Sequence, residues 1–135
     1  ELMVNALRCR QTNAEWSYRY LDQYTQPATV GRTMSVDTRI PERELFLAIK
    51  LHSGRFTDAR DVVAAAADAD FDRVETHLHR GDPDALSEQL AGISEQLADE
   101  SFVDAFKGEF QQQTVPEATI ENVRDFLAAQ QERLQ

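Results

Sequence analysis

Hydrophobic residues in the second half of the chain recur every three or four positions, which is the spacing of amphipathic α-helices. The clearest helix follows Asp82 and Pro83, a polar residue and a proline of the kind that begins helices. Its apolar positions are Leu86, Leu90, Ile93 and Leu97. Asp70 and Thr119 predict two further helix starts, each followed by a similar apolar face. The second half is therefore predicted to be helical, including a shorter apolar segment with Phe102, Phe106 and Phe110.

The first half combines strand and helix patterns. Residues 2–8 form a short, unbroken apolar run that predicts a buried strand. Residues 29–40 alternate between apolar and polar side chains and predict a second strand, with Gly31 as a turn residue and an earlier segment as its hairpin partner. Pro41 ends this strand. Between the strands, Asn13 is expected to cap a helix that stops before Pro27. Residues at helical spacing in this helix are expected to belong to the core: Trp16, Tyr20, Leu21 and Tyr24.

Together these patterns predict an α+β fold that is mostly α. A small N-terminal sheet fragment, with strands near residues 2–8 and 29–40, is followed by a helical bundle. A chain of 135 residues is long enough to bury one hydrophobic core, so we expect a single domain. Within it, residues 1–64 contain the sheet and the first helices, and residues 65–135 form the bundle.

The charge balance is strongly acidic, with 24 Asp and Glu against 14 Lys and Arg and a formal net charge of −10. This charge repels polyanions, which disfavours nucleic acids and anionic membranes as partners. Arginines far outnumber lysines, and the composition is typical of halophilic proteins of a high-salt cytoplasm. No apolar run is long enough to span a membrane, and the N-terminus lacks the pattern of a signal peptide, so we expect a cytoplasmic protein. The first residues already read like the middle of a strand, which suggests a fragment.

The strongest functional signal lies in residues 45–61. Residues 45–51 are apolar except for Lys50, which places one cation on an otherwise buried helix. Gly54 is expected to end this helix, and the Thr57 hydroxyl to cap a second one. The second helix begins with two aspartates on one face. The charged residues that this helical hairpin is expected to bring together are Lys50, Arg55, Asp58 and Asp61.

Two interpretations of this cluster remain open. In the first, Lys50 and Arg55 line an open cleft, and His52 at its edge helps to bind a phosphate or carboxylate. In the second, Lys50 forms an ion pair with Asp58 or Asp61 that fixes the hairpin, and His52 is an ordinary histidine at a helix end. We favour the cleft, because a helix this apolar tolerates leucine at position 50 if packing is the only demand.

No pattern typical of a metal site is present. His77 and His79 are two residues apart and point to nearly opposite sides of a helix, so they cannot bind one metal together. Cys9 is the single cysteine, which excludes both a Cys-x-x-Cys knuckle and a disulfide within the chain. Glycine-rich phosphate loops and nucleophile elbows are also missing.

Written as K-x-x-x-G-R-x-x-D-x-x-D, the stretch from Lys50 to Asp61 resembles a segment of nucleotidyltransferase-fold proteins of the abortive-infection (AbiEii-type) toxin group and its minimal relatives. In that group a strand that often ends in proline leads into an apolar helix with a lysine, then Gly-Arg and a second helix that starts with aspartates. Residues 36–62 of this chain follow the same layout. The resemblance implies that residues 1–64 are a partial nucleotidyltransferase-like region.

The resemblance implies a role for each charged residue. Lys50 would contact the nucleotide or the acceptor, and Arg55 would pair with a phosphate. Asp58 and Asp61 would orient these cations, and Asp37 on the preceding strand would be a catalytic carboxylate. The implied ligands are Mg²⁺ and a nucleoside triphosphate.

This sequence also departs from the group, whose members have a Gly-Ser pair and an Asp-x-Asp on an earlier strand. Neither occurs here before residue 37. Either that catalytic half precedes Glu1 in a longer protein or it has been lost, so we expect this chain alone to be inactive.

The function implied is the substrate-binding and helical part of a nucleotidyltransferase-like protein, as a toxin of a toxin–antitoxin pair with an antitoxin as partner. The alternative is a non-catalytic module that docks a partner or self-associates through its helices. A helix-turn-helix DNA-binding protein is disfavoured, because a recognition helix that begins with Asp58 and Asp61 would face phosphates.

Overall fold

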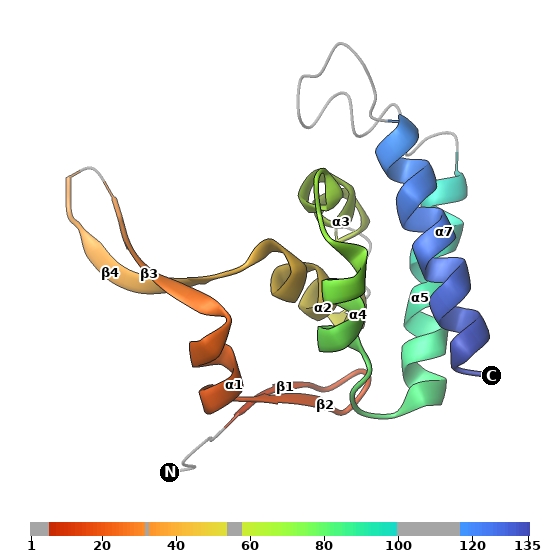
Figure 1. Cartoon of the computed structure of the whole chain (residues 1–135), viewed down its shortest axis with the longest axis horizontal. Coiled ribbons are helices and arrows are strands. Elements are labelled where there is room, and N and C mark those ends of the chain that lie inside the picture. The colour runs from red at the N-terminus through yellow and green to blue at the C-terminus, as the bar shows by residue number, and fades with distance from the viewer. Residues whose placement is uncertain (1–5, 32, 54–57, 100–116) are drawn as a thin grey trace.

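The computed structural model describes residues 6–31, 33–53, 58–99 and 117–135, and its architecture is α+β and mostly α, as predicted (Figure 1). Two short antiparallel hairpins occupy the N-terminal part, and helices follow. In chain order the elements are β1 (Ala6–Cys9), β2 (Ala14–Ser17), α1 (Tyr18–Gln23), β3 (Thr25–Val30), β4 (Val36–Pro41), α2 (Arg43–Ser53), α3 (Asp58–Ala66), α4 (Phe71–Leu78), α5 (Pro83–Ala98) and α7 (Glu117–Arg133).

β1 and β2 form the first hairpin, and here the predicted helix start is wrong. Asn13 does not cap a helix: it has a φ of 63° and lies in the turn between the strands. Helix α1 begins only after Ser17, whose hydroxyl accepts the backbone N–H of Tyr20. Burial alternates along β2: Trp16 is buried, and its two neighbours are exposed. Successive side chains of a strand point to opposite faces, so this alternation is typical of a strand.

β3 and β4 form the second hairpin, here called the arm (residues 25–41). A strand over residues 29–40 was predicted, with Gly31 as a turn residue and an earlier segment as hairpin partner. The structure contains this hairpin, but its second strand begins only at Val36, and Thr29 and Val30 belong to the partner strand β3. Gly31 follows the last residue of β3 and has a φ of 113°, which favours glycine. A Cβ there would lie 2.1 Å from the carbonyl oxygen of Met34. Pro27, expected beyond the end of a helix, lies within β3, which tolerates proline as an edge strand. The arm projects away from the helices (Figure 1).

The helices of the second half begin close to the predicted positions. Asp70 and Asp82 are N-caps whose carboxylates each accept two backbone N–H groups, and a proline begins α5. The predicted apolar face of α5 is buried throughout, at Leu86, Leu90, Ile93 and Leu97. α7 begins at Glu117, slightly before the predicted Thr119. The predicted segment with three phenylalanines, residues 102–110, lies outside the described residues.

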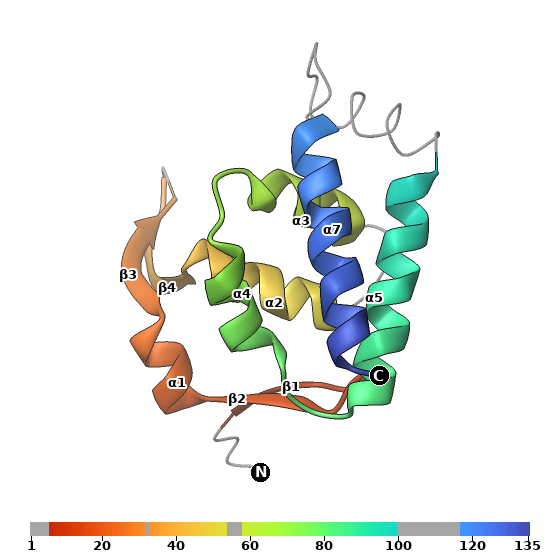
Figure 2. The ribbon, with the colours of Figure 1, turned by 45° about the vertical axis from the view of Figure 1, so that its right-hand side comes forward.

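Helix α2 contributes to both hydrophobic clusters of the molecule. The larger cluster joins α2 and α3 to α4, α5 and α7, and so contains residues from both 1–64 and 65–135. Figure 2 shows α5 and α7 side by side beside the other helices. The smaller cluster contains Trp16 and Leu45 and is surrounded by Tyr20 and Tyr24, so the aromatic residues of the first half pack in a core as predicted. Among the described residues, no helix is long and apolar enough to cross a membrane.

Candidate functional site

Helices α2 and α3 form the hairpin on which the sequence predicts a site. The buried residues of α2 are Leu45, Leu47, Ala48, Leu51 and His52, so most of this helix packs against the two clusters. Lys50 lies in its last turn, where the negative end of the helix dipole favours a cation. The Lys50 side chain is 21% exposed, so most of it packs against the protein.

Lys50 meets one of the predicted carboxylates. Its Nζ lies 3.1 Å from Oδ2 of Asp61 on α3, and 5.5 Å from the centre of the Phe46 ring. The Asp61 side chain is 44% exposed. The pair therefore joins the two helices as an ion pair would, but both partners remain in contact with water.

His52 does not lie at the edge of a cleft. Its side chain is fully buried, and both ring nitrogens have partners within the protein. Nε2 donates to the carbonyl oxygen of Leu78 at 2.7 Å, which leaves Nδ1 to accept the hydroxyl of Thr12 at 2.6 Å. Burial lowers the pKa of His52 below its usual 6.5, so the neutral ring is favoured. A neutral, enclosed imidazole is unsuited to binding an anion, and the predicted role of His52 in the site is replaced by a structural one.

Of the remaining predicted residues, Asp37, Arg55 and Asp58, the structure fully describes only Asp37. Asp37 lies on β4 in the arm, is exposed, and accepts the hydroxyl of Thr29 across the hairpin at 2.9 Å. It belongs to a different element from the Lys50–Asp61 pair, and the structure does not bring them together. Arg55 lies outside the described residues. Asp58 begins α3, but its side chain is not among those described.

A polar network that sequence reasoning missed joins α1 and α4 through Glu42, the residue between β4 and α2. The fully buried His77 of α4 donates from Nε2 to the carboxylate of Glu42 at 2.8 Å, and its Nδ1 accepts the hydroxyl of Tyr20. Arg73, one turn earlier on α4, holds the same carboxylate with two hydrogen bonds of 2.6 and 2.8 Å. The backbone carbonyl of His77 also accepts the indole N–H of Trp16 at 3.0 Å.

This network fastens α4 to the segments before α2. The hydrogen bond from Arg73 lowers the pKa of Glu42, and a further hydrogen bond from His77 adds to this, while burial opposes both. Both nitrogens of His77 are occupied by protein groups, so we interpret it as an anchor rather than as a catalytic base. Sequence reasoning considered His77 only as a metal ligand. His77 lies three residues after Val74, on the apolar face of α4. This helical spacing could have predicted that His77 is buried.

A second missed network connects α4 with α7. Gln130 of α7 is 2% exposed, and its side-chain oxygen accepts a hydrogen bond from Nε2 of His79 at 2.6 Å. Its amide group donates to Glu75 at 3.0 Å. His77 and His79 thus have different partners, Glu42 and Gln130. The spacing of Gln130, three residues from Leu127 on the apolar face of α7, was the signal that could have predicted its burial, although glutamine is usually exposed.

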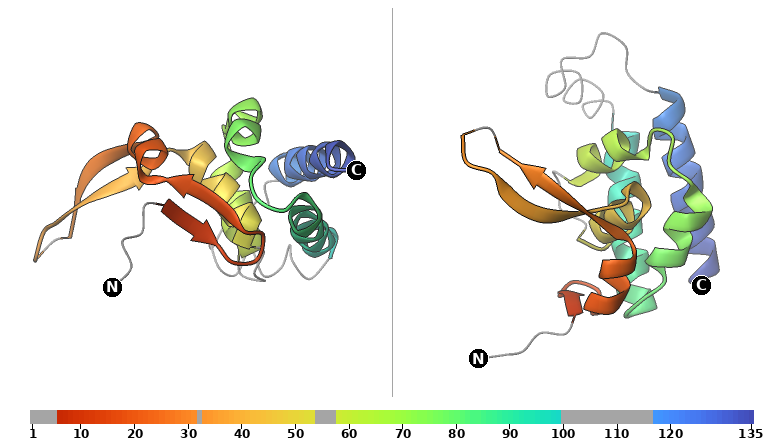
Figure 3. Two further views of the ribbon diagram at one scale, coloured as in Figure 1. Left: turned by 90° about the horizontal axis from the view of Figure 1, so that it is seen from below. Right: turned by 60° about the vertical axis from the view of Figure 1, so that its left-hand side comes forward.

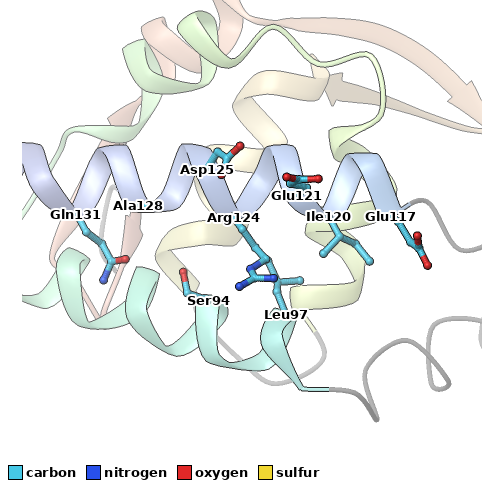
Figure 4. Close-up of a pocket in the computed structure, with 9 residues that line it drawn as sticks. All are labelled: Ser94, Leu97, Glu117, Ile120, Glu121, Arg124, Asp125, Ala128 and Gln131. Atoms are coloured by element: carbon cyan, nitrogen blue, oxygen red, sulfur yellow. The ribbon is translucent and has the colours of Figure 1, made fainter.

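Figure 4 shows a groove between α5 and α7, into which Arg124 extends from α7 toward α5. Its volume is about 660 Å³. The lining includes three carboxylates, at Glu117, Glu121 and Asp125, against the single guanidinium of Arg124. An acidic lining disfavours phosphates and other anions, so this groove does not suit the ligand that the sequence predicts.

Of the six predicted site residues, the structure brings together Lys50 and Asp61. It places Asp37 and His52 elsewhere, and Arg55 and the side chain of Asp58 lie outside what it describes. Comparisons with protein-family models, with curated proteins and with solved structures found no match for this chain.

Proposed function

We propose that this chain is the substrate-binding and helical part of a nucleotidyltransferase-like protein, and that the α2–α3 hairpin contacts the phosphates of a nucleotide. The observation that supports the proposal is the meeting of Lys50 and Asp61 at 3.1 Å, with both side chains partly exposed. The motif requires a lysine on one helix and an aspartate on the next to lie close together. A structure that kept them apart would have contradicted it.

The chemistry of the pair suits phosphate recognition. An ammonium group is a compact point charge that binds phosphate oxygens strongly, and Asp61 holds it at the surface in the absence of a ligand. In this proposal Arg55 and Asp58 complete the site, as the resemblance implies. The same resemblance extends the proposal to a toxin whose partner is an antitoxin.

The described residues do not fit the Mg²⁺ that nucleotidyl transfer requires. No group of three His, Cys, Asp or Glu side chains among them is arranged to hold a metal ion, and Asp37 stands on the arm with Thr29 as its partner. Cations at the phosphates cannot replace carboxylates at the metal. We therefore propose binding by this chain and assign it no catalytic step.

The test is thermal unfolding of the chain with ATP, CTP, GTP and UTP, each with and without Mg²⁺. A nucleotide that binds the folded state raises the melting temperature with increasing concentration. Lys50→Met is expected to abolish this rise. Arg19→Met removes a positive charge from exposed α1 and serves as the matched control, which should respond like the parent. Absence of any rise, or an equal response of the two variants, would overturn the proposal.

A further inference from the structure

A hollow lies between β1 and α2, and its volume of about 370 Å³ is in the usual range of small-molecule sites. From β1 it is lined by Leu7 and Cys9, and from α2 by Ile49 and Ser53. Figure 3 shows β1 beside α2. The Cys9 thiol donates to the backbone carbonyl of His52 at 3.3 Å, which ties β1 to the end of α2. The two walls of the hollow are therefore fixed relative to each other.

The inner part of this hollow is apolar. In the register of β1 and β2, Leu7 is directly opposite Trp16, so both side chains lie on the face that turns toward the smaller cluster. Trp16 also lines the hollow and is fully buried, whereas Cys9 and Ile49 are half-buried and Leu7 is 40% exposed. The apolar lining therefore extends from the core to the surface, and an apolar group that enters the hollow removes this lining from water.

The charged residues that line the hollow are both cations, Arg8 and Arg10, and no carboxylate lines it. Arg8 forms an ion pair with Glu15 on the outer face of the hairpin. A lining without carboxylates is unusual in a chain with 24 acidic and 14 basic residues. The groove between α5 and α7, the hollow between α7 and residues 66–71, and the hollow at the base of the arm each include at least one carboxylate. An anionic ligand is therefore repelled less between β1 and α2 than at these other places.

Lys50 lies next to this hollow on the surface of α2. It precedes Ser53 by three residues, and residues with this spacing are neighbours on a helix surface, with roughly 5 to 6 Å between their Cβ atoms. The hydroxyl of Ser53 also donates to the backbone carbonyl of Lys50 at 2.9 Å. The hollow and the Lys50–Asp61 pair thus adjoin along one side of α2.

A nucleotide has the two chemical parts that this arrangement suits, because its phosphates are anionic and its base has apolar faces. The ribose separates base and phosphates, so one molecule can occupy two adjoining sites. We propose that the base and ribose of the nucleotide occupy the hollow between β1 and α2 while its phosphates contact Lys50. This assignment rests on the proposed function and adds to it the position of the nucleoside.

Isothermal titration calorimetry of the whole chain tests the assignment, with inorganic triphosphate and the four nucleoside triphosphates as ligands. A nucleoside triphosphate is expected to bind at least about tenfold more tightly than inorganic triphosphate, because its base buries apolar surface in the hollow. Leu7→Ser shortens the apolar wall and is expected to weaken nucleotide binding by about threefold or more, with inorganic triphosphate unaffected. Val36→Ser removes an exposed apolar side chain from the arm and is the matched control, which should bind like the parent.

Cys9 provides a second measurement, because it is the single cysteine of the chain and lines the hollow. Its rate of alkylation by iodoacetamide, followed by mass spectrometry, is expected to fall in proportion to the fraction of chain that holds a nucleoside triphosphate. Inorganic triphosphate should leave the rate unchanged, since it does not enter the hollow. In Lys50→Met the same nucleotide concentration is expected to give no protection, because the phosphate contact is lost.

The outcomes separate this assignment from the proposed function. A nucleotide that raises the melting temperature but neither protects Cys9 nor loses affinity in Leu7→Ser overturns the assignment and leaves the proposed function standing. Equal affinities for inorganic triphosphate and all four nucleoside triphosphates also overturn it, because a base in the hollow adds affinity. If no nucleotide binds, both proposals are wrong.

Discussion

Lys50 and His52 lie two residues apart on α2 and face opposite environments. A helix separates such positions by about 200°. Lys50 reaches a half-exposed carboxylate, and His52 points into the protein between Thr12 and Leu78. Their proximity in sequence suggested a shared site. Helix geometry separates them, and only Lys50 remains a candidate for contact with a ligand.

Replacing Lys50 by methionine is expected to change the free energy of unfolding by less than about 1 kcal/mol. The reason is that Asp61, which would lose its partner, is 44% exposed and can be solvated by water. Chemical denaturation of Lys50→Met and of the parent measures the difference. Asp61→Asn, which removes the other partner, should have a similarly small effect. A loss of about 3 to 5 kcal/mol would instead indicate a closed ion pair and contradict the binding-site interpretation.

His52 is expected to make the folded state sensitive to mild acid. Its pKa in the folded protein is lowered by burial, whereas in the unfolded chain it titrates near 6.5. Below that pH the unfolded state binds more protons, so stability falls as the pH is lowered from 6.5 through the folded pKa. Urea unfolding at a series of pH values should show this fall in the parent.

The fall should be much smaller in His52→Gln, because an amide can keep both hydrogen bonds and does not titrate. His79→Gln removes a histidine from an exposed position and is the matched control. An unchanged pH dependence in His52→Gln would show that another group causes it.

At the scale of the elements, α5 has the best-defined inner face. Leu90 is fully buried in the larger cluster, and Glu88 on the same helix is exposed. Leu90→Ala is expected to destabilise the protein by about 2 to 5 kcal/mol through lost burial and a cavity. Glu88→Ala should change stability by less than about 0.5 kcal/mol. Equal effects in chemical denaturation would mean that the inner face is assigned wrongly.

The loop between α4 and α5 depends on Gly81. Its φ is 74°, and a Cβ would lie 2.3 Å from the carbonyl oxygen of Thr12 in the β1–β2 turn. The same carbonyl accepts the backbone N–H of Asp82 at 2.7 Å, so the turn and the loop are in close contact. Gly81→Ala is expected to destabilise by about 2 kcal/mol or more, from backbone strain and the clash.

Gly92 offers a matched control for this substitution. It lies within α5, and a Cβ there would meet no atom within 4 Å. Gly92→Ala is expected to stabilise the protein by about 0.5 to 1 kcal/mol, since alanine is the better helix former. If both substitutions changed the melting temperature in the same direction, the contact between loop and turn would not control stability.

At the scale of the whole molecule, α2 links the two hydrophobic clusters. Leu45 belongs to the smaller cluster, and Leu47 and Leu51 belong to the larger one. Unfolding either cluster therefore exposes part of α2 to water and weakens the other. This coupling favours one cooperative transition.

The single tryptophan, Trp16, reports the smaller cluster by fluorescence, and far-ultraviolet circular dichroism reports the helices of the larger one. The two signals are expected to give the same midpoint and the same slope in urea. An earlier fluorescence transition would show that the N-terminal hairpin and its cluster unfold independently of the helices.

Local patterns in the sequence were enough to predict the helices α4, α5 and α7 of the described second half. The caps Asp70 and Asp82 and the face of α5 depend on spacings within one helix, and these act before any tertiary contact forms. The ion pair of Lys50 with Asp61 was one of the two interpretations that the sequence left open, because the two residues are only eleven positions apart on consecutive helices.

Tertiary structure decided the rest. Trp16 and its neighbours form a strand because β1 pairs with them and the smaller cluster buries the indole, and residue spacing alone cannot distinguish this from a helix. His52 and His77 became anchors because their partners, Thr12, Leu78 and Glu42, come from segments between 26 and 40 positions away. Such pairings depend on how elements pack, and a pattern read along one element contains no information about which distant group will meet it.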